Sequence, residues 1–213
     1  MSDQPELSPL TPRAAEIVAA ARALLEEEGP DGLTMRALAD RLGIRAPSLY
    51  KHFPDKAAVE AALIEQGLAE MGNLLHAALD EAAAGAGAGS GDIGREDAGS
   101  GDAGREGAGG GGAIGAVLRA YRAASLARPN LYRLMTAGSL PRERLAPGLE
   151  EWSGTPFFLA AGEPYLAQAL WSFAHGMVIL ELDGRYPEGS DLERTWTEGV
   201  RAFVCARTPR PAA

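Results

Sequence analysis

The chain has 213 residues and a formal net charge of −9 at pH 7, and apolar residues make up 46% of it. No run of about 18 apolar residues is present and no basic start precedes an apolar segment, so we expect a cytoplasmic protein with no membrane partner. A single cysteine, Cys205, excludes an internal disulfide, and three scattered histidines argue against a metal site. We therefore expect no metal and no cofactor.

Helix-forming residues with apolar side chains three and four positions apart run along the chain, which predicts an all-α protein. The first helix is expected over residues 12–28, after a capping Thr11 and with proline at its first position. Gly29 would stop this helix. A second helix is expected to follow its cap Thr34, and Gly43 would supply the turn at its end.

A third, short helix is expected over residues 46–52, and Pro54 limits it because proline disfavours the α conformation of the residue before it. Asp55 would cap a long helix that continues to about residue 84. Two short helices that are joined by a tight glycine turn and braced by longer helices form a helix-turn-helix unit. The second short helix of such a unit can enter the major groove of DNA.

Positive charge is concentrated in this part of an acidic chain. Residues 33–56 hold five basic and two acidic side chains, a net charge of +3, so the other residues sum to −12. Because phosphate groups need a local positive potential, this window suits a polyanion although the chain as a whole does not. The residues expected to face outward from this helix-turn-helix are Arg45, Ala46, Ser48, Lys51 and His52.

Several of these side chains have the chemistry of a DNA contact. Lys51 and His52 can reach phosphates or base edges, and the Tyr50 hydroxyl can donate to a phosphate. Ser48 is short enough to allow close approach to the bases. Lys56 would lie in the first turn of the long helix, where free N–H groups and the helix dipole already favour an anion.

The run LTMRALADRLGIRAPSLYKHFPDKAAV resembles the DNA-binding domain of the TetR family of bacterial transcriptional regulators, over about residues 14–62. The landmarks of the resemblance are Thr34, Ala39, Gly43, Leu49, Tyr50, His52, Phe53 and Lys56. It implies that the DNA backbone is held by Thr34, Tyr50, His52 and Lys56. It also implies that the bases are approached by Arg36, Arg45, Ala46, Ser48 and Lys51. Pro47 departs from the small residue that is commoner at the start of this recognition helix, which leaves the operator sequence open.

Glycine, alanine and small polar residues dominate residues 85–112, where Ile93 is the one large apolar residue. Within them GSGDIGREDA at 89–98 is followed directly by GSGDAGREGA. Two copies of a polar, glycine-rich decamer cannot stack into a solenoid, so we expect a flexible insertion. The expected domains are a three-helix DNA-binding domain over residues 1–56 and a helical regulatory and dimerisation domain over 57–206, which contains the insertion.

Beyond the insertion we expect four helices. The first covers residues 114–128 and the second, a short one, follows Pro129. After an irregular connection, the last two cover residues 163–183 and about 191 to 206. Two long apolar helices cannot bury both their faces in so small a domain. We therefore expect a homodimer through the last two helices, which would form a four-helix bundle on a two-fold axis. A symmetric dimer reads a palindromic operator.

The stretch WSFAHG resembles a C-terminal subgroup of the TetR family that is named for its Trp-His-Gly signature. Similar proteins enclose a small-molecule pocket, and the resemblance implies an apolar effector whose candidate contacts are Tyr121, Trp171, His175 and Met177. Trp171 and His175 are four residues apart and share a helix face. A histidine on an apolar face can equally be a core residue that is hydrogen-bonded to a neighbour, so both roles of His175 stay open.

These features favour a ligand-responsive repressor. The effector would bind a state in which the two recognition helices are too far apart, and operator affinity would fall. The alternatives are a transcriptional activator of the same family and an architectural protein that binds DNA without sequence preference. No Gly-x-Ser-x-Gly elbow, phosphate-cradling glycine loop or HExxH motif is present, which argues against an enzyme.

Overall fold

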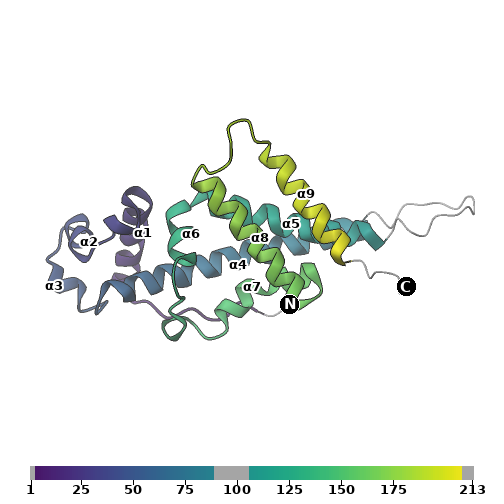
Figure 1. The fold of residues 1–213 in the computed structure, drawn as a ribbon. Coiled ribbons are helices and arrows are strands. Elements are labelled where there is room, and N and C mark those ends of the chain that lie inside the picture. The colour runs from purple at the N-terminus through teal and green to yellow at the C-terminus, as the bar shows by residue number, and fades with distance from the viewer. Residues whose placement is uncertain (1–2, 89–105, 208–213) are drawn as a thin grey trace, which may run out of the picture. The chain divides into compact units, whose positions relative to one another are not determined.

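The computed structural model describes residues 3–88 and 106–207, and all regular structure in these two ranges is helical (Figure 1). The predicted all-α fold is confirmed. Within the described parts, no helix is both long enough and apolar enough to span a bilayer. Contacts divide the chain into a first unit of residues 1–71 with 127–153, and a second unit of residues 72–126 with 154–213.

The first unit is built on α1 (Pro12–Gly32), which begins where the sequence predicts. Thr11 Oγ1 accepts a hydrogen bond from the Ala14 N–H at 3.2 Å, and proline occupies the first turn. Helical dihedrals break at Gly29, whose φ is 76°, so the regular part ends as expected and one further turn completes α1. The helix buries one face, which consists of Ala14, Ile17, Val18, Ala21, Leu24 and Leu25.

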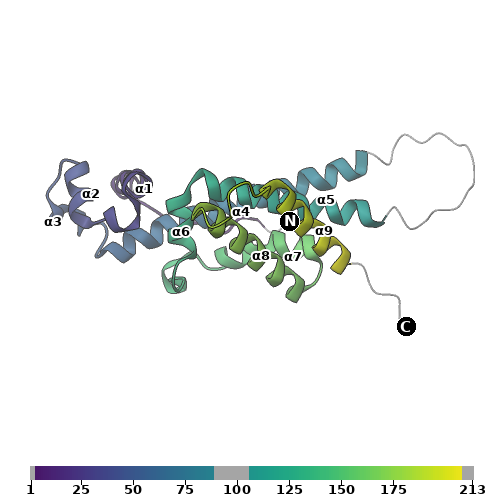
Figure 2. The ribbon, with the colours of Figure 1, turned by 45° about the horizontal axis from the view of Figure 1, so that its top comes forward.

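Two short helices, α2 (Met35–Arg41) and α3 (Ala46–Leu49), complete the predicted helix-turn-helix, and both ribbon views show them beside α1 (Figures 1 and 2). Thr34 Oγ1 caps α2 by accepting from the Ala37 N–H at 3.1 Å. Gly43 makes the turn with a φ of 64°, which few other residues adopt.

The helix α3 ends at Leu49, three residues before the predicted end. The His52 N–H donates to the Leu49 carbonyl at 2.9 Å, which is the tighter i to i+3 pattern that often closes a helix. Tyr50, Lys51 and His52 therefore lie in a turn that continues the direction of α3.

The long helix α4 (Lys56–Ala88) is capped as predicted, because Asp55 Oδ1 accepts from the Ala58 N–H at 2.6 Å. It extends four residues past the expected end, and α5 (Glu106–Ala127) begins before the expected start at residue 114. Both ends of the glycine-rich insertion are thus helical, although glycine is a poor helix former. The tandem repeat lies outside the described residues except for its last three, 106–108.

The helix α6 (Pro129–Thr136) packs on α1 in the first unit. On its other side it lies close to α4, where Gly67 makes room for it. A Cβ atom on Gly67 would overlap Sδ of Met135, so a larger residue there would require the Met135 side chain to move.

The connection after α6 holds a short 3-10 helix, η1 (Arg142–Arg144), and then α7 (Leu149–Ala161). The expectation of an irregular connection here is wrong for its second half. A glycine and Pro156 favour a break in this stretch, but α7 buries Leu149, Trp152 and Phe157 to 6% exposure or less, and that burial outweighs weak local propensity.

Glu65 of α4 forms hydrogen bonds with two other segments of the first unit. Only 4% of this residue is exposed, and its carboxylate accepts from the Ser8 hydroxyl at 2.8 Å and from the Ala146 N–H at 2.7 Å. The stretch before α1 and the connection before α7 are therefore both bound to the same buried side chain.

In the second unit, α8 (Pro164–Leu182) and α9 (Leu192–Arg207) lie side by side (Figures 1 and 2). The Phe173 ring packs on Trp196 and Phe203 with centroid distances of 5.7 and 5.6 Å. A Cβ on Gly199 would overlap this ring, which explains a glycine in the middle of α9.

One arginine of α5 joins both of these helices. Arg122 donates to the Glu181 carboxylate of α8 at 2.8 and 2.9 Å and to Glu193 of α9 at 2.5 Å. Its guanidinium carbon also lies 5.6 Å from the centre of the Trp196 ring. The hydrogen bond with Glu181 is the main reason that the pKa of Arg122 lies above its ordinary value.

Replacing Arg122 by methionine would leave Glu181, whose side chain is 15% exposed, without its partner. We expect the free energy of unfolding to fall by about 3 kcal/mol, measured by urea denaturation at a fixed protein concentration. The control is Arg119→Met, an exposed arginine one turn earlier in α5, which should cost less than about 0.5 kcal/mol. Equal losses for the two variants would show that Arg122 does not hold the three helices together.

Candidate functional site

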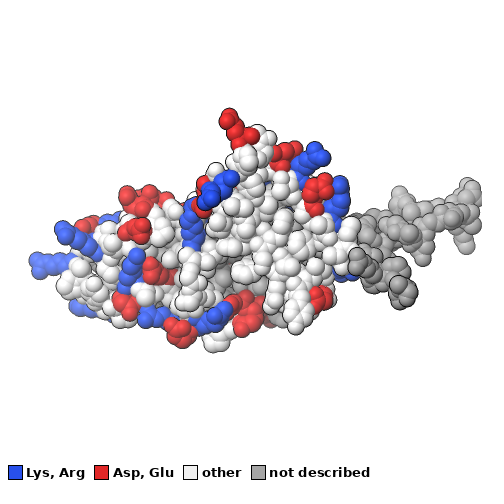
Figure 3. Space-filling view, viewed as in Figure 1, with Lys and Arg blue, Asp and Glu red and all other residues white. Residues whose placement is uncertain are grey.

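The residues predicted to contact DNA gather on α2, α3 and the start of α4 in the first unit. Figure 3 shows Lys and Arg side chains collected where α2 and α3 lie, in a surface that elsewhere carries both signs of charge. Six of the nine predicted residues are exposed, namely Thr34, Arg36, Arg45, Tyr50, Lys51 and His52. The other three are half-buried, namely Ala46, Ser48 and Lys56.

The core beneath α3 determines which side chains face outward. Leu49 is fully buried and Phe53 is 6% exposed, and these two residues are four positions apart on the inner side. The residues between them must face solvent, and half of the Tyr50 side chain is accessible, at 51%. Lys51 and His52 are exposed for the same reason.

Lys56 occupies the predicted first position of α4, but it already has partners. Its ammonium donates to the Pro30 carbonyl at 3.1 Å and lies 3.2 Å from a Glu60 oxygen. A phosphate group would therefore compete with Glu60 for this cation. The hydrogen bond to Pro30 meanwhile holds the ammonium beside the last turn of α1.

Arg36 is held more loosely. Its Nε lies 3.9 Å from an Asp40 oxygen, and the two side chains are 92% and 75% exposed. An ion pair that is this exposed and this long contributes little to stability, so the Arg36 side chain can turn toward another acceptor. Small side chains at Ala46 and Ser48 leave room for close approach of the α3 backbone.

The site can thus bind a polyanion through the cations and hydroxyl groups that α2, α3 and the start of α4 carry. The structure brings the nine predicted residues together in one unit. The role of each residue toward phosphate or base stays a prediction.

The four predicted effector contacts do not converge in the second unit. Tyr121 is 4% exposed and packs edge-to-face on Phe157 with ring centres 5.4 Å apart. Met177 is 7% exposed, and its Sδ accepts from the Tyr186 hydroxyl at 2.9 Å.

Trp171 and His175 lie on another face of α8. The Trp171 residue is 47% exposed, and its ring stacks on the His175 ring with centres 5.8 Å apart and planes at 22°. Burial lowers the pKa of the His175 imidazole, because it disfavours the charged form. Whether these four residues contact an effector stays a prediction.

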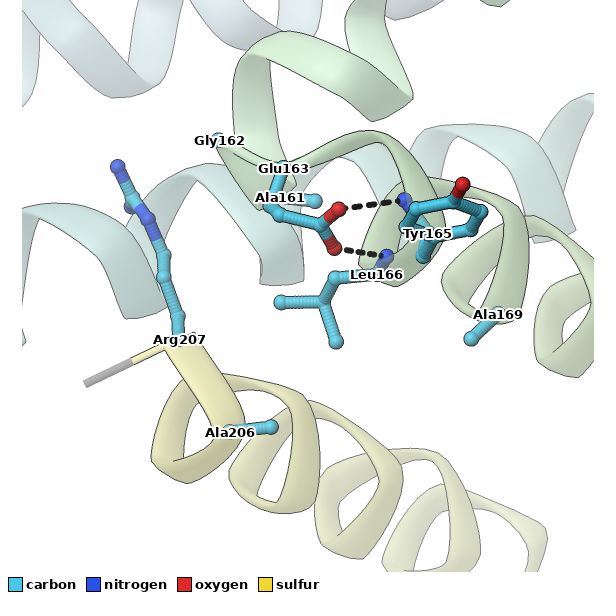
Figure 4. A pocket seen from close by; sticks show the side chains of 8 residues that line it. All are labelled: Ala161, Gly162, Glu163, Tyr165, Leu166, Ala169, Ala206 and Arg207. Atoms are coloured by element: carbon cyan, nitrogen blue, oxygen red, sulfur yellow. Dashed lines mark hydrogen bonds between the residues drawn. The ribbon is translucent and has the colours of Figure 1, made fainter. Parts of the chain in front are cut away.

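A pocket of about 580 Å³ lies in the second unit between the turn from α7 to α8 and the end of α9 (Figure 4). Glu163 caps α8 at its rim, with its carboxylate accepting from the N–H groups of Tyr165 and Leu166 at 3.0 and 2.7 Å. Arg207 reaches toward Gly162 across this rim. None of the four predicted effector residues lines the pocket. Sequence reasoning missed it because helix ends without any motif form its walls.

Two family models match the chain. The model described as bacterial regulatory proteins of the tetR family matches residues 17–63. The model described as a tetracyclin repressor-like, C-terminal domain matches residues 114–203. Assignment to the Trp-His-Gly subgroup stays a prediction.

Curated relatives match over about a quarter of the chain. The tetracycline repressor protein class A from transposon 1721 of Escherichia coli is 54% identical over 54 residues, which is 25% of each chain. The class G tetracycline repressor protein of Vibrio anguillarum is 48% identical over 54 residues, 25% of this chain and 26% of that one. The chain thus spans about a quarter of the length of the curated relatives it matches.

Solved structures match over most of the chain. A protein of unknown function from Rhodococcus sp. RHA1 has a TM-score of 0.65 at 21% identity, covering 89% of this chain and 92% of that one. A glutamine-to-alanine variant of TetR from Acinetobacter baumannii AYE, in complex with minocycline, has a TM-score of 0.57 at 22% identity, covering 94% and 100%. Structural similarity at such low identity shows the fold, and the two family models show the family. The chain therefore belongs to the TetR family of bacterial regulatory proteins, which are regulators and not enzymes.

Proposed function

We propose that this protein is a cytoplasmic transcriptional repressor that binds a palindromic operator as a homodimer and is released by a small apolar effector. The observation that carries the proposal is the exposed set of cations and hydroxyl groups around α3, which sits on a buried core. Repression is proposed rather than activation because the matched curated relatives are named repressors. These relatives are 48–54% identical to the chain over 54 residues.

The outer face of α8 supports the homodimer. Residues 164–180 contain no Asp, Glu, Lys or Arg, and this helix exposes 80% of Tyr165, 47% of Trp171 and 42% of Leu180. Ser172 and Gly176 lie between them, so the face is apolar and shallow. Figure 3 shows the surface over α8 almost without charged side chains between its ends. Such a face suits another helix pair.

The outer face of α9 is different and limits its contribution. It carries the exposed ion pair of Arg201 with Glu198, whose atoms are 3.0 Å apart. We therefore place α8 at the centre of a dimer interface through the last two helices, with α9 at its edge. A two-fold axis there would present two copies of α3 to two half-sites of one palindrome.

The proposed effector is apolar because the buried interior of the second unit contains aromatic and thioether groups such as Tyr121, Phe157 and Met177. The TetR structure named above is a complex with minocycline. An effector that prefers one of two dimer states shifts the population toward that state. Release from DNA requires that, in the state which the effector prefers, the two α3 helices are too far apart for the operator.

The central test is selection of bound duplexes from a genomic library and from a random library. We expect an inverted repeat to emerge, with an affinity at least about 10³-fold above that for random duplex at the same salt concentration. Equal affinities would instead indicate an architectural protein without sequence preference. The genes next to selected genomic sites would point to the class of effector.

For Lys56→Ala we expect weaker binding to every duplex, because a contact to phosphate carries no sequence information. The slope of log affinity against log salt concentration should become shallower by about 0.9. An unchanged slope would remove Lys56 from the phosphate contacts.

Lys51→Ala should behave differently if this side chain meets a base edge. We expect the ratio of affinities for the selected operator and for a single-base variant to fall by about fivefold or more at one position. A loss that is equal for all sequences would make Lys51 a backbone contact instead.

Ser172→Arg tests the dimer face by placing a charge in the middle of α8. We expect the dimer dissociation constant, measured by analytical ultracentrifugation, to rise by at least about 100-fold. The matched control is Thr197→Arg in α9, because both hydroxyls donate to the carbonyl four residues earlier, at 2.8 and 2.9 Å. A folded Ser172→Arg protein that dimerises like the control would contradict the proposed interface.

A further inference from the structure

An arginine from the connection after α6 lies at the start of α4. Arg144 Nη1 donates to Asp55 Oδ1 at 3.0 Å, and its Nη2 donates to Asp55 Oδ2 at 3.4 Å. The two residues are 89 positions apart in the sequence, but both belong to the first unit. Asp55 is the residue that caps α4, since it also accepts from the Ala58 N–H. The Arg144 guanidinium is therefore fixed beside the first turn of α4.

The charges around this turn give Arg144 a consequence for an anion. Lys56 lies there with the carboxylates of Asp55 and Glu60, and its ammonium is 3.2 Å from a Glu60 oxygen. One cation and two carboxylates leave a net charge of −1, which would repel a phosphate group. Arg144 brings the sum to zero. The predicted phosphate contact at Lys56 is thus electrostatically favourable only with this arginine in place.

The Arg144 side chain has capacity for a second acceptor. A guanidinium carries five N–H groups, and the hydrogen bonds with Asp55 leave some of them for another oxygen. The Arg144 side chain is 39% exposed and that of Asp55 is 49% exposed, so solvent reaches both partners. Guanidinium groups bind phosphate oxygens in pairs through parallel N–H groups. Arg144 can therefore bind a phosphate without leaving the start of α4.

The distance from the recognition element suits such a contact. His52 and Asp55 are three positions apart, so their Cα atoms are separated by at most about 11 Å. Between them Phe53 is buried and Pro54 is exposed. The major groove of B-DNA is about 12 Å wide, and the phosphate backbones border it. With α3 in the groove, a side chain held by Asp55 lies within reach of a phosphate at its edge.

We infer that Arg144 is a phosphate-binding residue of the DNA interface, which the connection after α6 contributes in addition to the helix-turn-helix. The family model that describes the N-terminal part ends at residue 63, so Arg144 lies outside it. The inference rests on the proposed function, because it requires DNA as the ligand. A contact to phosphate carries no sequence information, so Arg144 adds affinity for every duplex and leaves the choice of operator unchanged.

The experiment compares Arg144→Gln with Arg142→Gln in the full chain. Both changes remove one exposed positive charge from η1, but Arg142 pairs with Glu150 of α7 at 2.6 Å. The probes are the selected duplex and a random duplex, at salt concentrations from about 50 to about 200 mM. Circular dichroism and ultracentrifugation first establish that each variant is folded in the oligomeric state of the wild type. Exposed ion pairs contribute little to stability, so both variants are expected to fold.

For Arg144→Gln we expect the affinity for both duplexes to fall by the same factor. The slope of log affinity against log salt concentration should become shallower by about 0.9, which is the effect of one lost phosphate contact. The advantage of the wild type over this variant should therefore shrink about 3.5-fold across that range of salt concentration. Arg142→Gln should keep the slope of the wild type.

A second comparison separates a direct contact from an effect through the cap. Asparagine caps a helix as well as aspartate does, so Asp55→Asn keeps the cap and removes the ion pair. If Arg144 acted only by holding Asp55, its replacement would have no effect on binding in the Asp55→Asn protein. We expect the same loss of slope in this background. The comparison of Asp55→Asn with the double variant also serves as the test if Arg144→Gln alone does not fold.

Three outcomes would overturn the inference. They are a wild-type slope in folded Arg144→Gln, an equal loss of slope in Arg142→Gln, and a loss that disappears in the Asp55→Asn background. Failure of the wild type to prefer any inverted repeat over random duplex would instead refute the proposed function. The slope on random duplex would still test Arg144 in that case, so the two failures are distinguishable.

Discussion

Burial of one face of α1 is the interaction on which the rest of the first unit depends. Ile17, Val18 and Leu25 are fully buried, and each contributes about 1.5–3 kcal/mol by leaving water. A helix of four residues such as α3 has no stability of its own, since helix nucleation is costly. Leu49 ties α3 to the face of α1, and Leu131 ties α6 to it as well. The helices α3 and α6 therefore share one core with α1.

The acidic balance of the chain becomes intelligible once its carboxylates are located. Several carboxylates of the first unit are paired with guanidinium groups. Pairing reduces the repulsion that they would exert on a phosphate. Asp55 lies next to Lys56 and pairs with Arg144 at 3.0 Å. Hydrogen bonds from Arg144 and from the Ala58 N–H hold the pKa of Asp55 below its ordinary value. The guanidinium offsets this negative charge at the place where a phosphate would meet Lys56.

Local signals in the sequence predicted the caps and the turn correctly, because Thr11, Thr34, Gly43 and Asp55 act within four residues of their own position. The gathering of the candidate DNA-contacting residues followed from the same signals. Three features could not be found in this way. The helix α7 depends on burial that overrides Pro156, the link from Glu26 to α6 joins distant segments, and a helical period alone does not say whether Trp171 faces the core or solvent.

Glycines inside the described helices differ in what surrounds the position of a Cβ atom. Gly67 and Gly199 each face a side chain that would clash with a Cβ, namely Met135 and Phe173. Gly176 in α8 is different, because no described atom of the chain outside its own helix turn lies within 4 Å of the position of its Cβ. A glycine there costs about 1 kcal/mol relative to alanine. A close contact with another molecule would offset that cost, and the uncharged face around Gly176 is where a second copy of α8 would approach.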